Sequence, residues 1–484
     1  MAGLPGLPGL SLPGLSQANP TPISGQAAAV SAPLRTEELG QRAELRFEVA
    51  VGKQYSIRLL RGTAEIFGTE LAPSSTHNFS GTKAAVFTWH GCTLEVQGEA
   101  ESEYVASETD AMVEWLNVHG MLETVRSDAS SGMESNGGPR VMVVGPDHSG
   151  KTSLVKSLTG WALKSGRCPT VVNLDPREGL LSIPSSLSAV TMSSMMDIEE
   201  GWGTSPISGP TNNPVKTPLV YHFPFASPED KTDMFKPIIT RAALAVTSRL
   251  EDNKEAKDSG IIIDSPGSLN QPRGNYDNIT HIVSEFSINV LLVLGSERLY
   301  NDMARKFGNA KNAEDVVHVF RISTPGGAVA RDETHMRQVR QQQIKTYFFG
   351  EAKAPLNPHG QWWDFSELSI YKAVNKSASE TNLSFLPGMD EDETAAASNQ
   401  SWSSSFEKVT PEQGMLNGIL AIKFCPGKAS EESIRDSCVM GFVYVAEVDD
   451  GRKRVRFLAP HPSRWGDRAL VWGNWPESVG DLVA

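Results

Sequence analysis

The sequence predicts a multidomain protein. We expect an N-terminal antiparallel β-sandwich, then a central α/β domain with a mostly parallel sheet, and last a small β-rich C-terminal domain. Short, alternating β-type segments without intervening helices occupy residues 38–106. Continuous apolar segments then alternate with helical ones, which is typical of a parallel sheet covered on both faces. Strand-type segments return from residue 351, and 484 residues are enough for three cores.

The N-terminal third divides into a tail, a β domain and a helix. Residues 1–35 repeat the letters "LPGL" and predict a disordered, low-complexity tail. A secretory signal is disfavoured because a basic start is lacking and proline and glycine interrupt the apolar run. We place the β-sandwich domain at residues 36–130, where segments such as "ELRFEVAV" and "KAAVFTW" are separated by polar turns. Helical periodicity covers residues 110–129, and the following residues to 138 predict a linker.

The central domain, residues 139–350, opens with the strongest motif of the chain, "VMVVGPDHSGKTS". The pattern Gly145-x4-Gly150-Lys151-Thr152 follows a strand and begins a helix, as a phosphate-binding loop (P-loop) requires. Glycine lets several backbone N–H groups point at one anion, and the helix N-terminus adds its dipole. Lys151 is expected on the outer phosphates and Thr152 on Mg²⁺, with Ser153 beside it. The sequence therefore predicts a P-loop NTPase domain that binds a nucleotide.

Acidic and basic residues near other strand ends could complete this site. Asp264 ends the apolar strand of "GIIIDSPG" and is a magnesium ligand or a turn cap. Asp175, in "NLDPREG", is a general base or a turn aspartate, and spacing alone does not separate the two. The segment "SERLYNDMARKF" carries Arg298, Arg305 and Lys306, which form a cationic lid or a solvated helix face.

Composition limits the remaining possibilities. The net charge of −13 excludes a general binder of phosphate backbones. Four scattered cysteines without a C-x-x-C pair predict reduced thiols in an intracellular compartment and no zinc cluster. The longest apolar run, residues 288–294, is too short to span a membrane. The C-terminal domain, residues 351–484, contains an acidic, serine-rich stretch at residues 377–405 that predicts a mobile insert.

Several segments resemble the Clp-one family, subunits of the mRNA cleavage and polyadenylation machinery that are related to polynucleotide 5′-hydroxyl kinases. These segments are "ELRFEV", "GTAEIFGTEL", "AAVFTWHGCTLEVQG", "PRVMVVGPDHSGKTSL", "SIPSSLSA", "PLVYHF" and "SERLYND". The resemblance covers residues 38–484 outside the insert and is to fungal members. It implies that the N-terminal domain grips ATP, with Glu44 on the adenine side and Lys83 near the base or ribose. The expected ATP-binding residues are Glu44, Lys83, Gly145, Asp147, His148, Ser149, Gly150, Lys151, Thr152 and Ser153, and the expected metal ligands are Thr152 and Asp264.

The chain departs from the active kinases that it resembles. Those kinases carry an acid-x-Asp-x-Gly-Gln pattern after the second strand, where this chain has Asn173 in place of the first acid. Asp175 is kept, but Arg177 and Glu178 replace the Gly-Gln pair. A Gly-Trp clasp that stacks an RNA base is replaced by residues 265–268, and stacking contributes about 1–3 kcal/mol per base. The resemblance with these departures predicts little or no kinase activity.

Two functions follow as alternatives. The first is an ATP-binding structural subunit of the pre-mRNA cleavage complex that uses ATP and Mg²⁺ as bound cofactors. Its expected partner is the scaffold subunit of cleavage factor IA (Pcf-eleven type), its RNA contact is indirect or weak, and the resemblance places it in the nucleus. The second is an active RNA 5′-hydroxyl kinase with Asp175 as base. A GTPase switch is disfavoured because no guanine-reading Asn/Thr-Lys-x-Asp sequence stands out.

Overall fold

The N-terminal part of the chain is a β-sandwich, as the sequence predicts. The computed structural model describes residues 34–132, 137–199, 218–308, 316–351, 354–374, 405–462, 465–480 and 482. One sheet has the order β1 (Arg35–Leu39), β8 (Cys92–Gly98), β3 (Tyr55–Gly62) and β6 (Thr76–Phe79). The other has the order β5 (Thr69–Glu70), β4 (Glu65–Ile66), β7 (Lys83–Thr88), β2 (Ala43–Glu48) and β9 (Ser102–Ala106). All these pairings are antiparallel, and alternate residues of β3 are buried between the sheets, as a half-buried strand requires.

The predicted tail and insert fall almost entirely outside the described residues. Residues 1–33 of the tail and 377–404 of the insert are not described. Arg35, which we placed in the tail, belongs instead to β1 and pairs with Val96 of β8. The predicted helix after the sandwich is α1 (Asp110–Ser131), which ends at Gly132 in a left-handed conformation.

The central sheet has the order β13 (Leu219–His222), β12 (Ser186–Thr191), β11 (Thr170–Asn173), β14 (Ile261–Asp264), β10 (Arg140–Val144), β15 (Val290–Leu294) and β16 (His318–Ile322). The strands β11, β14, β10, β15 and β16 are mutually parallel. Strand β12 pairs antiparallel with both of its neighbours, β11 and β13. The mostly parallel sheet is therefore confirmed. Its helices are α2 (Lys151–Lys164), α3 (Thr232–Glu251), α4 (Lys254–Ser259), α5 (Asp277–Glu285), α6 (Glu297–Phe307) and α7 (Glu333–Phe349).

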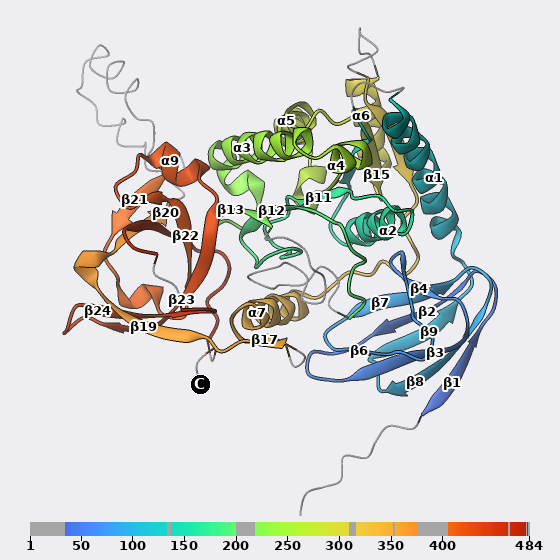
Figure 1. The fold of residues 1–484 in the computed structure, drawn as a ribbon, viewed down its shortest axis with the longest axis horizontal. Coiled ribbons are helices and arrows are strands. Elements are labelled where there is room, and N and C mark those ends of the chain that lie inside the picture. The colour runs from blue at the N-terminus through green and yellow to red at the C-terminus, as the bar shows by residue number, and fades with distance from the viewer. Residues whose placement is uncertain are drawn as a thin grey trace, which may run out of the picture.

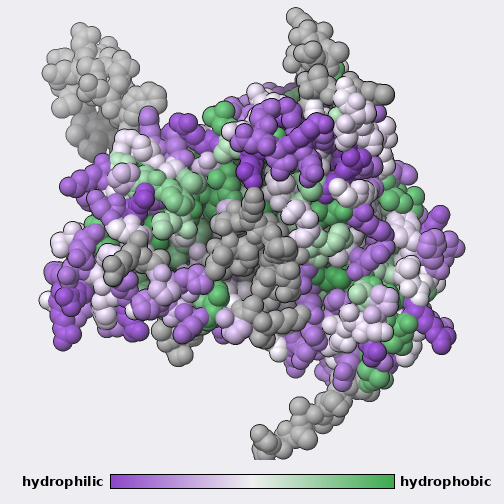
Figure 2. All heavy atoms as spheres, in the orientation of Figure 1, coloured by the Kyte–Doolittle hydropathy of each residue, from purple (hydrophilic) through white to green (hydrophobic). Residues whose placement is uncertain are grey.

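The C-terminal part is built on a second seven-stranded sheet. Its order is β19 (His359–Asp364), β24 (Arg454–Ala459), β23 (Val439–Asp449), β22 (Ile419–Pro426), β25 (Arg468–Trp472), β20 (Ser369–Ala373) and β21 (Phe406–Val409). The short helix α9 (Glu431–Asp436) links β22 to β23, and β17 (Gly350–Glu351) pairs with β18 (Ala354–Pro355). Figure 1 shows the sandwich and this sheet on opposite sides of the central domain, with α7 between them. Figure 2 shows hydrophilic side chains along the outer edges of this face and smaller hydrophobic patches between the elements.

The sandwich is fixed to the central domain through α2. The turn between β4 and β5 lies so close to this helix that a Cβ on Gly160 would come within 2.8 Å of the Gly68 carbonyl carbon. The buried Glu65 carboxylate accepts a hydrogen bond from the Trp161 indole at 3.1 Å and one from the Trp89 indole at 3.3 Å. Because a buried carboxylate needs such partners, these contacts define how the two domains meet beside the phosphate loop.

Candidate functional site

The phosphate loop joins β10 to α2 and is shaped by close backbone contacts. A Cβ at Gly145 would lie 2.5 Å from the Leu294 carbonyl oxygen, and Gly150 has a φ of +89°. Both positions therefore require glycine. The Ser149 hydroxyl and the Lys151 ammonium both donate to the Pro146 carbonyl, at 2.9 and 2.7 Å. The loop is thus held in a curled form at the start of a fourteen-residue helix, whose dipole favours an anion there.

Two residues expected to hold a metal lie together at the inner end of the loop. Thr152 Oγ1 donates to Asp264 Oδ2 at 2.6 Å. Asp264 is only 2% exposed and lies at the carboxyl end of β14, where ligands bind in open α/β sheets. Its Oδ1 is buried and has no hydrogen-bond partner among the described residues. Burial raises the pKa of Asp264 to about 7, against the opposing effects of Thr152 and Lys151.

Residues 173–179, called here the phosphate-end turn, cross from the end of β11 toward the loop. Asn173 is fully buried and its side chain brackets this turn: Oδ1 accepts from the Asp175 N–H at 3.0 Å. Asn173 Nδ2 donates to the Glu178 carbonyl at 2.8 Å and to the Asp175 carbonyl at 3.3 Å. An amide fits this position because it both accepts and donates, whereas an ionised carboxylate only accepts.

Arg177 carries the turn across to the loop. Its Nη2 donates to Asp147 Oδ1 at 2.5 Å, and its backbone N–H donates to Asp175 Oδ1 at 2.9 Å. Burial, followed by the negative charge of Glu178, raises the pKa of Asp175 to about 6. The Arg177 side chain lines the pocket, at the position where the resemblance leads us to expect a glycine in active kinases.

The other end of the pocket is formed by the sandwich. Glu44 is buried and forms an ion pair with Arg46, which also donates to Glu108 Oε1 at 2.9 Å. Burial raises the pKa of Glu44, and the hydrogen bond from Arg46 opposes that rise. Lys83 forms an ion pair with Glu48 at 2.7 Å. Both residues expected on the base side therefore line the pocket, but each already has a charged partner.

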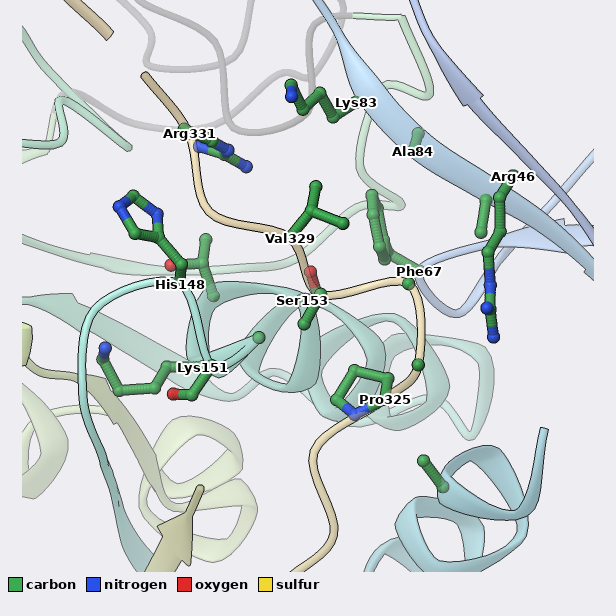
Figure 3. A pocket seen from close by; sticks show the side chains of 18 of the residues that line it. Arg46, Phe67, Lys83, Ala84, His148, Lys151, Ser153, Pro325, Val329 and Arg331 are labelled. Carbon is green, nitrogen blue, oxygen red and sulfur yellow. The ribbon is translucent and has the colours of Figure 1, made fainter. Parts of the chain in front are cut away.

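A strand-to-helix connection, residues 325–331, crosses between these two ends. Figure 3 shows it running past α2, with Phe67, Lys83 and Arg46 toward one end and His148 and Lys151 toward the other. A Cβ at Gly327 would come 3.0 Å from Arg46 Nε, so glycine lets the connection lie against that guanidinium. Sequence reasoning missed this connection and its pocket residues Pro325, Gly326, Gly327, Ala328, Val329 and Arg331. The letters "PGGA" after an apolar strand were the available signal, since ligands bind outside the carboxyl ends of such strands.

The pocket brings together most of the residues that the sequence singled out. It is lined by Glu44, Lys83, Asp175, Arg177, Glu178 and all residues from Asp147 to Ser153. Sequence reasoning also missed Arg46, Phe67, Trp115 and Arg340, which line it as well. His148 is exposed to solvent on one side, and partial desolvation of its ring by the pocket wall lowers its pKa, against the opposing effect of the neighbouring Asp147.

The basic residues of α6 lie elsewhere. None of the three lines the pocket as the described residues form it. Arg298 and Arg305 are exposed and each lies 3.9 Å from Asp302, while Lys306 donates to the Asn275 carbonyl at 2.7 Å. Among the described residues, no cluster of three or more histidine, cysteine or acidic side chains could hold a metal. The described helices also include none long and apolar enough to cross a membrane.

Three family models match the chain in succession. Residues 38–129 match the N-terminal beta-sandwich domain of polyadenylation factor, and residues 145–350 match the mRNA cleavage and polyadenylation factor CLP1 P-loop. Residues 356–477 match the model of pre-mRNA cleavage complex II protein Clp1. Together these models cover most of the described chain.

Curated relatives match at full length. The mRNA cleavage and polyadenylation factor clp1 of Botryotinia fuckeliana is 48% identical over 475 residues, covering 98% of this chain and 100% of the relative. The factor CLP1 of Phaeosphaeria nodorum is 51% identical with the same coverage. Among solved structures, a wild-type Clp1p–Pcf11p complex matches with a TM-score of 0.79 and 26% identity, over 92% of this chain and 98% of that one. A second, described by an extended Pcf11p–Clp1p interface and the basis of ATP loss in a point mutant, matches equally well.

Proposed function

Because the chain belongs to the Clp1 family of mRNA cleavage and polyadenylation factors, we propose that it is an ATP-binding structural subunit of the pre-mRNA cleavage complex. In this role it is required for 3′-end cleavage and polyadenylation, and it holds ATP rather than turning it over. The P-loop supplies the phosphate site, and the sandwich supplies the base side through Glu44 and Lys83. ATP would then tie the two domains into one arrangement.

The observation that carries this proposal is the construction of the phosphate-end turn. An acceptor hydroxyl needs a free base and open space beside the γ-phosphate. Here the side-chain oxygen and nitrogen of Asn173 both form hydrogen bonds within the turn. The Arg177 side chain reaches across to Asp147. Both features favour retention of a nucleotide and disfavour transfer of its phosphoryl group.

Mg²⁺ is the cation that fits the inner end of the loop. The unpartnered Oδ1 of buried Asp264 and the hydroxyl of Thr152 are oxygen ligands of the kind that Mg²⁺ prefers. A bound Mg²⁺ would neutralise phosphate charge. Asp264 would then be ionised, although burial alone favours its protonated form.

We propose that the partner is a Pcf11-type scaffold subunit and that the protein acts in the nucleus. The solved structures that match this chain are complexes of Clp1p with Pcf11p, which supports the partner. Messenger RNA cleavage and polyadenylation, the process named in the relatives, is a nuclear process and supports the location. RNA contact is expected to be indirect or weak, given the chain's net charge of −13.

The proposal is tested on the purified full-length protein. The protein is denatured, the released nucleotide is identified, and fresh protein is incubated with labelled ATP and 5′-hydroxyl RNA. We expect intact ATP in the denatured sample and no label on the RNA. Label transfer that is lost in Asp175→Ala would overturn the structural role and establish the alternative, an RNA 5′-hydroxyl kinase with Asp175 as base. That alternative is favoured by one observation, the survival of Asp175 at the pocket wall with a pKa near 6.

Coupling between ATP and the partner gives a second prediction. Lys151→Ala removes the ammonium expected on the outer phosphates, so ATP should be lost and co-purification of the Pcf11-type subunit should fall. Binding to the folded state alone stabilises it by about 4 kcal/mol at a thousandfold excess of ligand over Kd, which sets the scale of the loss. Lys254→Ala is the matched control, because its side chain is 80% exposed on α4. Undiminished co-purification of an ATP-free Lys151→Ala protein would contradict the coupling.

A further inference from the structure

The phosphate-end turn is held from outside as well as from within. The Pro176 carbonyl accepts two hydrogen bonds, from the Ser185 N–H at 2.8 Å and from Trp475 Nε1 at 2.9 Å. Gln343 Nε2 of α7 donates to the Gly179 carbonyl at 3.2 Å. Trp475 lies nearly 300 positions further along the chain, beyond the last strand of the C-terminal sheet, so a distant part of the fold reaches the wall of the nucleotide pocket.

Trp475 is itself fixed by a buried arginine. The guanidinium of Arg340, which is 2% exposed and lines the pocket, lies over the Trp475 ring at 4.8 Å. Arg340 also forms ion pairs with Glu333 of its own helix, at 2.6 Å, and with Glu477. A planar guanidinium suits this double role because it stacks on an aromatic face and bonds carboxylates at its edge.

The segment that carries Trp475 is anchored in the C-terminal sheet. The Val479 N–H donates to the Asn417 carbonyl at 3.0 Å, and the Tyr444 hydroxyl of β23 donates to the Val479 carbonyl at 2.9 Å. Val479 packs in one hydrophobic cluster with Ile344 and Phe348 of α7. Trp475 therefore reaches the turn from a rigid support.

We propose that Trp475, held by Arg340, is a positioning residue that keeps the phosphate-end turn closed over the phosphate loop and so slows the release of nucleotide. Arg177 forms the contact of this turn with Asp147 on the loop. If the turn opens as a unit and carries Arg177 away from the loop, the adjoining Pro176 carbonyl moves with it and its hydrogen bond from Trp475 breaks. We call the contacts of Arg340 with Trp475 and of Trp475 with Pro176 the clamp. Through the clamp the C-terminal domain controls how long ATP remains bound, a role that rests on the proposed function.

The test compares two Trp→Phe variants of the full-length protein. Trp475→Phe removes the indole N–H and keeps an aromatic ring for Arg340, whereas Trp362→Phe changes a 43% exposed tryptophan on the edge strand β19. The dissociation rate of labelled ATP is measured in a chase with excess unlabelled ATP. Loss of one net hydrogen bond predicts a rise of about 2- to 10-fold for Trp475→Phe and no change for Trp362→Phe. An unchanged rate in Trp475→Phe, in protein that remains folded, would overturn the proposal.

A second measurement separates failure of the clamp from failure of the proposed function. Amide hydrogen exchange of a peptide spanning residues 174–186 reports opening of the turn whether or not ATP is bound. Faster exchange in Trp475→Phe supports the clamp, and unchanged exchange refutes it even if the wild-type protein proves to hold no nucleotide. Arg177→Ala completes the test, because the double variant should release ATP no faster than Arg177→Ala alone if Trp475 acts through Arg177.

Discussion

Asn173→Asp introduces the acid that the family resemblance leads us to expect in active kinases, and it leaves the size of the side chain almost unchanged. If the asparagine were only a lost catalytic acid, the substitution would be harmless. The structure predicts otherwise, because Asn173 Nδ2 donates to the carbonyls of Glu178 and Asp175 at 2.8 and 3.3 Å. A carboxylate cannot donate, so both carbonyls would face a buried negative charge that has Asp175 close by. Two lost hydrogen bonds at about 1 kcal/mol each, with the burial of a charge, give an expected loss of about 2–5 kcal/mol in the free energy of unfolding.

The measurement is urea-induced unfolding of the wild-type and variant proteins at pH 5 and pH 8. Burial raises the pKa of the introduced carboxyl group, so its penalty should be larger at pH 8, where the unfolded state gains from ionisation. Asn253→Asp is the matched control: Asn253 caps α4 by accepting from the Ala256 N–H, a task that aspartate performs equally well. An Asn173→Asp protein as stable as the wild type at pH 8 would refute the structural role of Asn173. We expect no RNA kinase activity in this variant, as we propose for the wild type, because Arg177 still reaches Asp147.

Two further predictions concern the loop and the domain contact. The pKa of Asp264 is raised to about 7, so its protonated form stabilises the fold at low pH and that stability is lost as the pH rises through 7. Nucleotide-free Asp264→Asn should therefore show a smaller fall in Tm between pH 5 and pH 8 than the wild type, and equal slopes would contradict the assignment. Gly160→Ala should lower both the Tm and the ATP affinity, because its Cβ would come within 2.8 Å of the Gly68 backbone and displace the adjoining pocket residue Phe67. Gly120→Ala in α1 has open space and should instead stabilise by up to about 1 kcal/mol; equal effects of the two variants in calorimetry would rule out the packing argument.

Much of the fold could be predicted because the decisive signals are local. The apolar run before Gly145, the spacing to Lys151 and the helical periodicity after it all lie within one short stretch of sequence. The antiparallel edge of the central sheet was harder to foresee. Strand β12 contains Ser186 and Ser188, both buried, and its polar composition lacks the apolar pattern by which the five parallel strands were found.

The parts of the site that could not be predicted depend on contacts between distant segments. An arginine at the position of Arg46 reads as an ordinary exposed strand residue, yet Arg46 is only 6% exposed. Glu44 and Glu108 neutralise its charge, and the connection at residues 325–331 packs against its guanidinium. Trp475 carries no motif, and its bond to Pro176 exists only because α7 and the C-terminal sheet pack together. Sequence periodicity reports which face of an element is buried, but not what that face meets.

The same residues bear on two explanations for the expected departures from the kinase pattern beside this P-loop. Simple decay would leave the altered positions without structural duties, since selection on them would have ceased. Instead Asn173 binds its own turn with all of its amide groups, Arg177 joins that turn to the phosphate loop, and the Pro176 carbonyl between them accepts Trp475 from the C-terminal domain. These bonds reinforce one another, because each fixes the same few residues beside the same loop. A turn built in this way is suited to closing a nucleotide pocket, as the proposed retention of ATP requires.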